Sequence, residues 1–145
     1  MLKRSVAAVL LTFSLTASAI SAYAIEQRIE LTGNLWEHEK GEAIINDAAQ
    51  GQKEITINAS GLEPNSVYTL WLVTETSDIG QVAMGAGDLT FKSDAQGNLN
   101  STATVPVVEI SDWDTLRVVH HPTGDPKDLE NSEVALEGDL SGGLK

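Results

Sequence analysis

The sequence contains no cysteine, so it can form neither a disulfide nor a zinc–thiolate site, and thiol chemistry is excluded. Long helical periodicity is also missing, because no extended stretch after the N-terminal segment repeats apolar residues at helical spacing. Basic residues are few, with 9 Lys and Arg against 21 Asp and Glu among 145 residues. Such an acidic chain repels nucleic acid and anionic membrane surfaces, and we expect neither as a partner.

Residues 1–24 have the three parts of a secretory signal peptide. Lys3 and Arg4 supply positive charge, an apolar stretch follows, and Ala22-Tyr23-Ala24 gives the small-x-small pattern that a signal peptidase cleaves. The apolar stretch falls short of the about 20 residues that a membrane span needs. We therefore expect an exported protein, periplasmic or extracellular, with no membrane insertion after cleavage. The remaining chain would carry 7 basic and 21 acidic residues, a formal net charge of −14.

Residues 25–140 consist of short β-type runs separated by turn residues, which predicts one all-β domain. In residues 53–59 the alternation is clear, since Ile55 and Ile57 would face inward while Glu54 and Thr56 face outward. We predict a single antiparallel β-sandwich of about seven strands, immunoglobulin-like, followed by a flexible tail over residues 141–145. The predicted strands are residues 25–35, 53–59, 67–74, 88–92, 99–105, 113–120 and 133–140.

Residues 67–74 carry apolar side chains on both faces, which is typical of a strand that is covered on both sides. This pattern places Trp71 in the core, and alternation in the last strand turns Val134 and Leu136 inward. Two segments fit no strand of a minimal sandwich. We expect residues 41–51 to form one or two helical turns or a covering loop, and residues 76–87 to form a glycine-bearing connection of functional length.

A resemblance to known sandwich domains covers about 40 residues, from 59 to 98. Residues 59–73 read ASGLEPNSVYTLWLV and residues 91–98 read FKSDAQGN. The first stretch resembles the Gly-Leu-x-Pro corner of fibronectin type III domains. It is also similar to the extracytoplasmic sandwich domain of anti-sigma-K-type regulators. Because the shared residues specify a turn and a core strand, the resemblance implies the fold and does not imply anti-sigma activity.

His120 and His121 are the first candidate site, together with His38 and Asp125. Two or three imidazoles and a carboxylate would suit copper or zinc. In a regular strand, however, neighbouring side chains point to opposite faces, so the pair can share one ion only if the strand ends at Val119. The alternative is that His120 is half-buried and hydrogen-bonded while the other two histidines face solvent. The acidic residues that follow do not have the spacing of a calcium-binding EF-hand loop.

Trp36 and Trp113 are the second candidate, as interaction residues near strand ends. Exposed, they would form a platform for a carbohydrate or peptide; buried, they would cap the ends of the sandwich.

The sequence favours an exported, non-enzymatic binding or assembly module. Its contacts would involve an unknown protein partner or a second copy of the chain, through loops or an edge strand. No nucleophile-elbow sequence supports catalysis. The alternative is a periplasmic protein that binds copper or zinc through His120 and His121.

Overall fold

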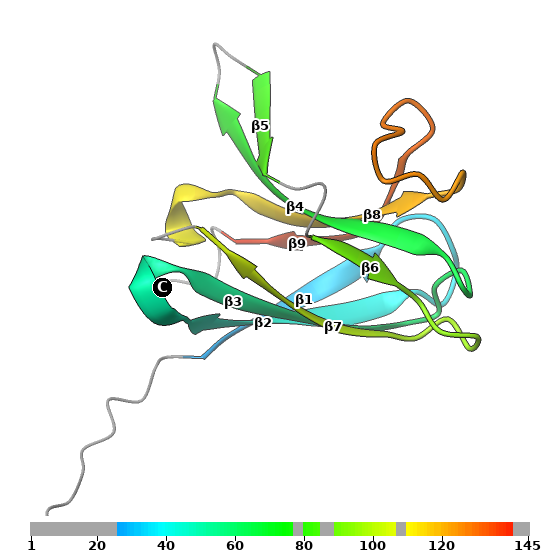
Figure 1. The fold of residues 1–145 in the computed structure, drawn as a ribbon, viewed down its shortest axis with the longest axis horizontal. Helices are drawn as coiled ribbons and strands as arrows, with labels where there is room; N and C mark the ends of the chain where they lie inside the picture. The colour runs from blue at the N-terminus through cyan, green and yellow to red at the C-terminus, as the bar shows by residue number, and fades with distance from the viewer. Residues whose placement is uncertain (1–25, 77–79, 85–88, 107–109, 141–145) are drawn as a thin grey trace, which may run out of the picture.

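The computed structural model describes residues 26–76, 80–84, 89–106 and 110–140. The predicted signal peptide at residues 1–24 and the tail at residues 141–145 therefore lie outside the described residues. Within these ranges no helix has the length and apolar character needed to cross a membrane. The elements, shown in Figure 1, are β1 (Gln27–Gly33), β2 (Lys40–Asp47), η1 (Ala49–Gly51), β3 (Lys53–Ser60), β4 (Val67–Thr76), β5 (Gly80–Met84), β6 (Thr90–Lys92), β7 (Leu99–Val105), η2 (Ile110–Asp112), β8 (Thr115–His121) and β9 (Glu133–Asp139).

The strands form one antiparallel sheet in the order β5-β4-β8-β9-β1-β2-β3-β7. The short strand β6 pairs with the first residues of β4, and β5 pairs with its last residues. The sheet curls until β4, β8 and β9 lie over β1, β2, β3 and β7 (Figure 1). The result is a nearly closed barrel, and the far end of β4 continues into a hairpin with β5 that stands away from it.

This single curled sheet corrects the predicted two-sheet sandwich of about seven strands. All strand pairs are antiparallel as expected, but β1 joins the two layers. It pairs with β2 along six residues and with β9 at Thr32 and Gly33. The short pairing with β9 at the end of β1 joins the two layers into one continuous sheet.

Residues 41–51 also differ from the prediction, since most of them form the strand β2. The segment contains Gly41, Asn46, Asp47 and Gly51, residue types that are depleted in strands, yet Ala43 and Ile45 are buried between β1 and β3. Pairing on both sides satisfies the backbone of β2 and overrides the weak local preference. In residues 76–87, the part from Gly80 to Met84 is the strand β5, while residues 77–79 and 85–87 lie outside the described residues.

Residues 94–98, whose sequence DAQGN favours a hairpin turn, form a turn between β6 and β7, but the two strands do not make a hairpin because β6 pairs with β4 and β7 pairs with β3. The Asp94 carboxylate accepts hydrogen bonds from the backbone N–H groups of Gln96 and Asn98, at 2.9 and 2.8 Å. Gly97 has a φ of +77°, a left-handed conformation that glycine adopts without steric cost. Its carbonyl accepts a hydrogen bond from Leu62, so this turn is tied to the turn that precedes β4.

The core fills the inside of the barrel with the inward side chains of successive strands. Ile55 and Ile57 are fully buried, as their alternation predicts. Tyr68 is also fully buried, and its hydroxyl donates to the Glu63 carbonyl at 3.3 Å. Burial raises the pKa of Tyr68 well above its ordinary value, since the phenolate would have to form without water.

Candidate functional site on the outer face of the barrel

His120 and His121 end β8 and point to opposite sides of the sheet. His120 is buried inside the barrel, where its ring centroid lies 5.3 Å from that of Trp36 and 5.1 Å from that of Tyr68. Its Nδ1 atom lies 3.7 Å from a carboxylate oxygen of Glu133. His121 is 1% exposed and lies on the outer side. Because β8 continues through His121, the two imidazoles do not converge on one ion.

The other residues of the predicted metal site, His38 and Asp125, make other contacts. The side chain of His38 is 88% exposed and lies 3.9 Å from Glu37. The Asp125 carboxylate accepts a hydrogen bond from the backbone of Lys127 in the loop after β8. Over the residues that the structure describes, no three histidine or carboxylate side chains gather as a metal site would require.

Trp36 and Trp113 are half-buried, and both pack against the core. Trp36 contacts His120 near the end of β8, and Trp113 lies just before the start of the same strand. The two indoles therefore lie at opposite ends of β8 and form no common platform.

On the outer side, His121 takes part in a hydrogen-bonded chain with Thr69 and Trp71. The Trp71 indole N–H donates to Thr69 Oγ1 at 2.7 Å, and the same hydroxyl lies 2.7 Å from His121 Nε2. His121 Nδ1 lies 3.4 Å from the backbone carbonyl of Asp128. An indole only donates and a carbonyl only accepts, so the chain runs from Trp71 through Thr69 and His121 to Asp128.

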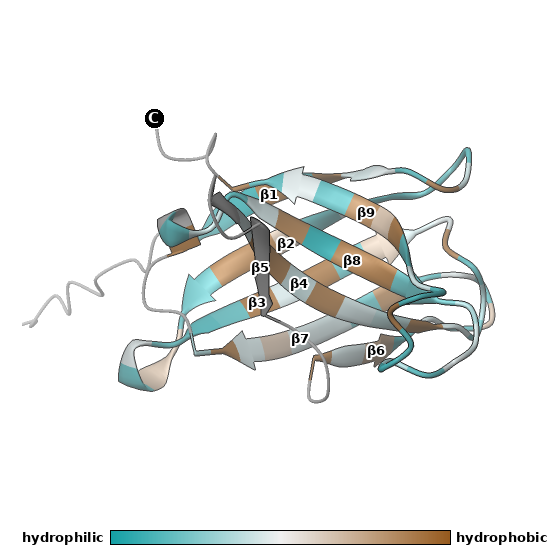
Figure 2. Ribbon diagram, turned by 90° about the horizontal axis from the view of Figure 1, so that it is seen from above, coloured by the Kyte–Doolittle hydropathy of each residue, from teal (hydrophilic) through white to brown (hydrophobic). Residues whose placement is uncertain are grey.

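Beside this chain the outer face of β4, β8 and β9 is apolar. Val73 and Val119 are 3% and 7% exposed, although neither belongs to the core cluster inside the barrel. Figure 2 views this layer from above and shows hydrophobic positions along β4 and β8. The surface forms a groove of about 270 Å³, here called the apolar groove, lined by Trp71, Val73, Arg117, Val119, Leu129, Ser132 and Val134.

A β-bulge places Val134 in the apolar groove rather than in the core, where the sequence had predicted it. Val118 pairs with Leu136, but Val119 pairs with Val134, so β9 has one extra residue, Ala135, at this point. Val118 and Leu136 are inside the barrel, and the valines of the next pair both line the groove. Alternation turns Val118 and Val119 to opposite sides of the sheet, and the bulge places Val134 rather than Ala135 opposite Val119.

Trp71 is the second correction, because it is half-buried in the apolar groove and not in the core. The predicted division of β4 into two faces is confirmed: Tyr68, Leu70 and Leu72 belong to the core cluster, and Trp71 and Val73 do not. The apolar residues on the two faces of β4 therefore have different roles. One face fills the barrel, and the other forms the floor of the groove.

Residues 122–132, here called the strap, connect β8 to β9 and border the apolar groove (Figure 1, orange). The Asp128 carboxylate accepts hydrogen bonds from the Asn131 side chain at 2.9 and 3.1 Å and from the Thr123 hydroxyl at 3.0 Å. These bonds, chiefly the one from the Asn131 side chain, lower the pKa of Asp128 below its ordinary value. The strap holds Leu129 at the rim, where it is 54% exposed.

Charged groups near the apolar groove lie mainly on β8, β9 and the strap. Arg117 Nε donates to a carboxylate oxygen of Glu137 at 2.8 Å across the two strands. The Arg117 side chain is 21% exposed and that of Glu137 is 42% exposed. Glu130 follows Leu129 in the strap and is exposed. The groove therefore combines an apolar floor with the Arg117–Glu137 pair and the exposed Glu130 at its borders.

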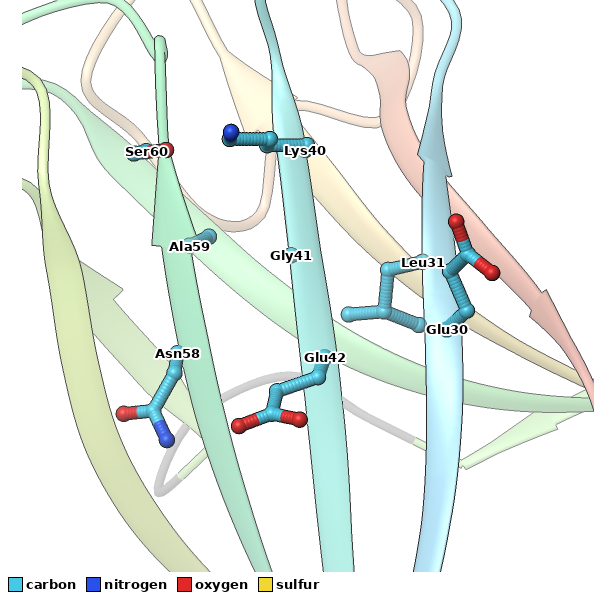
Figure 3. A pocket seen from close by; sticks show the side chains of 8 residues that line it. All are labelled: Glu30, Leu31, Lys40, Gly41, Glu42, Asn58, Ala59 and Ser60. Atoms are coloured by element: carbon cyan, nitrogen blue, oxygen red, sulfur yellow. The ribbon is translucent and has the colours of Figure 1, made fainter.

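The outer face of β1, β2, β3 and β7, here called the polar face, has a different chemistry. Thr56 and Thr102 hydroxyls lie 2.8 Å apart, and Arg28 lies 3.4 Å from Glu42. A shallow depression of about 440 Å³ centres on Gly41, which has no side chain (Figure 3). Such a surface is usual where a sheet faces water. The depression is lined by Glu30, Leu31, Lys40, Gly41, Glu42, Asn58, Ala59 and Ser60.

Sequence reasoning missed four side chains of the apolar groove: Arg117, Val119, Leu129 and Ser132. The one signal for the groove was the apolar character of both faces of residues 67–74, which required a cover on each side. Leu129 is a single apolar residue in an acidic loop, and this pattern alone does not predict a binding groove.

Comparisons with protein-family models, with curated proteins and with solved structures give no match for this chain. Its function is therefore argued from the apolar groove and its surroundings.

Proposed function

We propose that the protein is an exported, non-enzymatic module that binds another protein through the apolar groove. The observation that carries this proposal is the exposed Leu129, held beside Trp71 and Val119 on a sheet face turned away from the core. A sheet face in water normally carries polar side chains, as the polar face does. An apolar patch with a polar rim is typical of an interaction site.

The dimensions of the groove favour a protein side chain as its occupant. Pockets for small molecules usually measure about 300–1,000 Å³, and at about 270 Å³ the groove is smaller and open on one side. Tryptophan and arginine, both present here, are the residue types most enriched among side chains that dominate binding at protein interfaces. An apolar anchor from a partner would cover Trp71 and Leu129 and remove them from water.

The polar groups beside the groove support binding rather than catalysis. Both ring nitrogens of His121 are close to hydrogen-bonding atoms, and Arg117 is paired with Glu137. These groups hold the strap and the sheet in position. Export is supported by residues 1–24 and by the resemblance of residues 59–98 to extracytoplasmic immunoglobulin-like sandwich domains.

Site-specific photo-crosslinking in the producing cell tests this proposal. A photoreactive residue replaces Leu129 in one variant and Thr102, on the polar face, in the control. We expect a discrete crosslinked protein from position 129 that is absent from position 102 and is lost when Val134→Asp is added. Equal crosslinking from both positions, or crosslinking that Val134→Asp leaves intact in a protein that still folds, would contradict the proposal.

A further inference from the structure

We infer that the occupant of the apolar groove is a cationic segment of a different protein, with a large apolar residue flanked by lysine or arginine. This inference rests on the proposed function and specifies the chemistry of the partner. It follows from the charges that border the groove.

The part of the chain that forms the groove and its rim is strongly acidic. Residues 115–139 contain six acidic and two basic side chains. One of the two basic groups, Arg117, already pairs with Glu137. Apart from the Arg117–Glu137 pair, this part of the chain has five acidic groups and one basic group, Lys127, and therefore an excess of four negative charges.

Glu130 and the Arg117–Glu137 pair lie at the two ends of the apolar floor. Glu130 adjoins Leu129 in the strap, at the end of the groove formed by Val119 and Val134. Glu137 lies beside Arg117, further along the same two strands. An apolar anchor seated over Trp71 would therefore have the Glu130 carboxylate on one side and the Arg117–Glu137 pair on the other, and a lysine or arginine flank can reach Glu130.

Charge also decides between a different protein and a second copy of this chain. A symmetric dimer through the groove would bring the same acidic surface face to face with itself. Like charges across an interface oppose association, whereas opposite charges steer the partner and raise its association rate. The exported chain, with 7 basic and 21 acidic residues, is an unfavourable partner for itself.

Three synthetic peptides test the inference by NMR titration of the exported protein. They share a central Leu-Leu pair and differ only in their flanks, which are lysine, serine or glutamate. The methyl signals of Val119, Leu129 and Val134 report on the groove, and those of Ile44, on the outer side of β2, serve as the reference. We expect the lysine-flanked peptide to shift the groove signals and to bind about tenfold tighter than the serine-flanked one at low salt.

The salt dependence of peptide affinity and one charge-reversal variant then separate the electrostatic contribution to binding from the apolar contribution. Raising ionic strength from 0.05 to 0.5 M should reduce the affinity for the lysine-flanked peptide about tenfold and change the serine-flanked peptide little. Glu130→Lys should weaken only the lysine-flanked peptide, several-fold. Glu54→Lys, at an exposed position of β3 on the polar face, is the matched control and should leave both affinities nearly unchanged.

The outcomes distinguish this inference from the proposed function. If the serine-flanked or glutamate-flanked peptide binds the groove as tightly as the lysine-flanked one, the charge inference is wrong and the groove remains a binding site. If groove signals shift with protein concentration alone and light scattering shows a dimer, the occupant is a second copy. If none of the peptides shifts the groove signals, both the inference and the groove as a binding site are contradicted.

Discussion

The polar face and the apolar groove are both outer surfaces of one continuous sheet, yet they differ in what the outward side chains contact. On the polar face, Thr56 bonds to Thr102 across the strands and Arg28 pairs with Glu42. In the groove, Val73 and Val119 are nearly as buried as core residues. A strand that faces water on one side shows clear alternation, as β3 does. The strand β4 lacks that alternation because both of its sides are covered.

The difference shows that the barrel interior does not account for all the apolar side chains of this protein. The strap covers part of the outer side of β8 and β9, and it leaves Leu129 and Trp71 partly uncovered. Burial on the outer side therefore contributes to stability, and the uncovered remainder is available for binding.

The largest expected difference between the two faces concerns a buried charge. Val119→Asp would place a carboxylate against Val134 and under the strap without a partner. We expect it to lower the free energy of unfolding by about 3 kcal/mol or more. Thr102→Asp, at an exposed position of β7, should cost about 1 kcal/mol or less. Urea denaturation of both variants measures the difference, and equal losses would mean that the groove is as hydrated as the polar face.

A smaller difference is expected for two threonines that occupy corresponding outward positions. Thr69→Val removes the hydroxyl between Trp71 and His121. The Trp71 indole N–H and the His121 Nε2 atom then lose that hydrogen-bond partner. The expected loss of stability is about 1–3 kcal/mol. Thr56→Val breaks only a hydrogen bond that water can replace, and should change stability by about 0.5 kcal/mol or less. A loss at Thr69 no greater than that at Thr56 would show that the chain from Trp71 to Asp128 does not support the strap.

The sequence was most informative where a single strand determines which way its own side chains point. The alternation of β3, the two faces of β4 and the Asp94 turn could all be predicted from residues near one another. The opposite directions of His120 and His121 also follow from a regular strand. Such features need no knowledge of the partner strand.

Features that depend on pairing between distant strands could not be predicted in this way. β2 was missed because residues 41–51 carry a weak local preference and become a strand only between β1 and β3. The direction of Val134 depends on the bulge at Ala135, which is set by the register between β8 and β9. A one-residue change in register moves a side chain to the other face, so alternation alone placed Val134 on the wrong side.

The ion pairs of Arg117 and Arg28 give a third comparison, for which we expect smaller changes in stability. Arg117 is 21% exposed and bonds to Glu137 beside the apolar groove, whereas Arg28 is 58% exposed and lies between Glu26 and Glu42. We expect Arg117→Gln to cost about 1 kcal/mol and Arg28→Gln about 0.3 kcal/mol, because exposed pairs are screened by water and salt. Thermal unfolding in low and high salt checks this, and only the Arg28 effect should disappear at 1 M salt.

The smallest effect concerns the strap at acidic pH. Hydrogen bonds from Asn131 lower the pKa of Asp128, so the ionised carboxylate stabilises the folded strap. A lowered pKa means that this stabilisation is complete above the ordinary pKa of aspartate and is lost as the pH falls through the lowered value. We therefore expect the NMR signals of Leu129 and Val134 to change as the pH falls below the ordinary pKa of aspartate, while those of Ile44 on the polar face stay constant.

Asn131→Ala sharpens this test because it removes the donor that contributes most to the lowered pKa. The pKa of Asp128 should rise toward its ordinary value, and the Leu129 signals should begin to change at a higher pH than in the unaltered protein. Asn100→Ala, on β7 of the polar face, is the control and should leave the acid transition of the strap where it is. If Asn131→Ala does not move the transition, the Asp128 carboxylate does not hold the strap. The order of the strap beside the groove would then depend on apolar packing and on the contact between His121 and the Asp128 carbonyl.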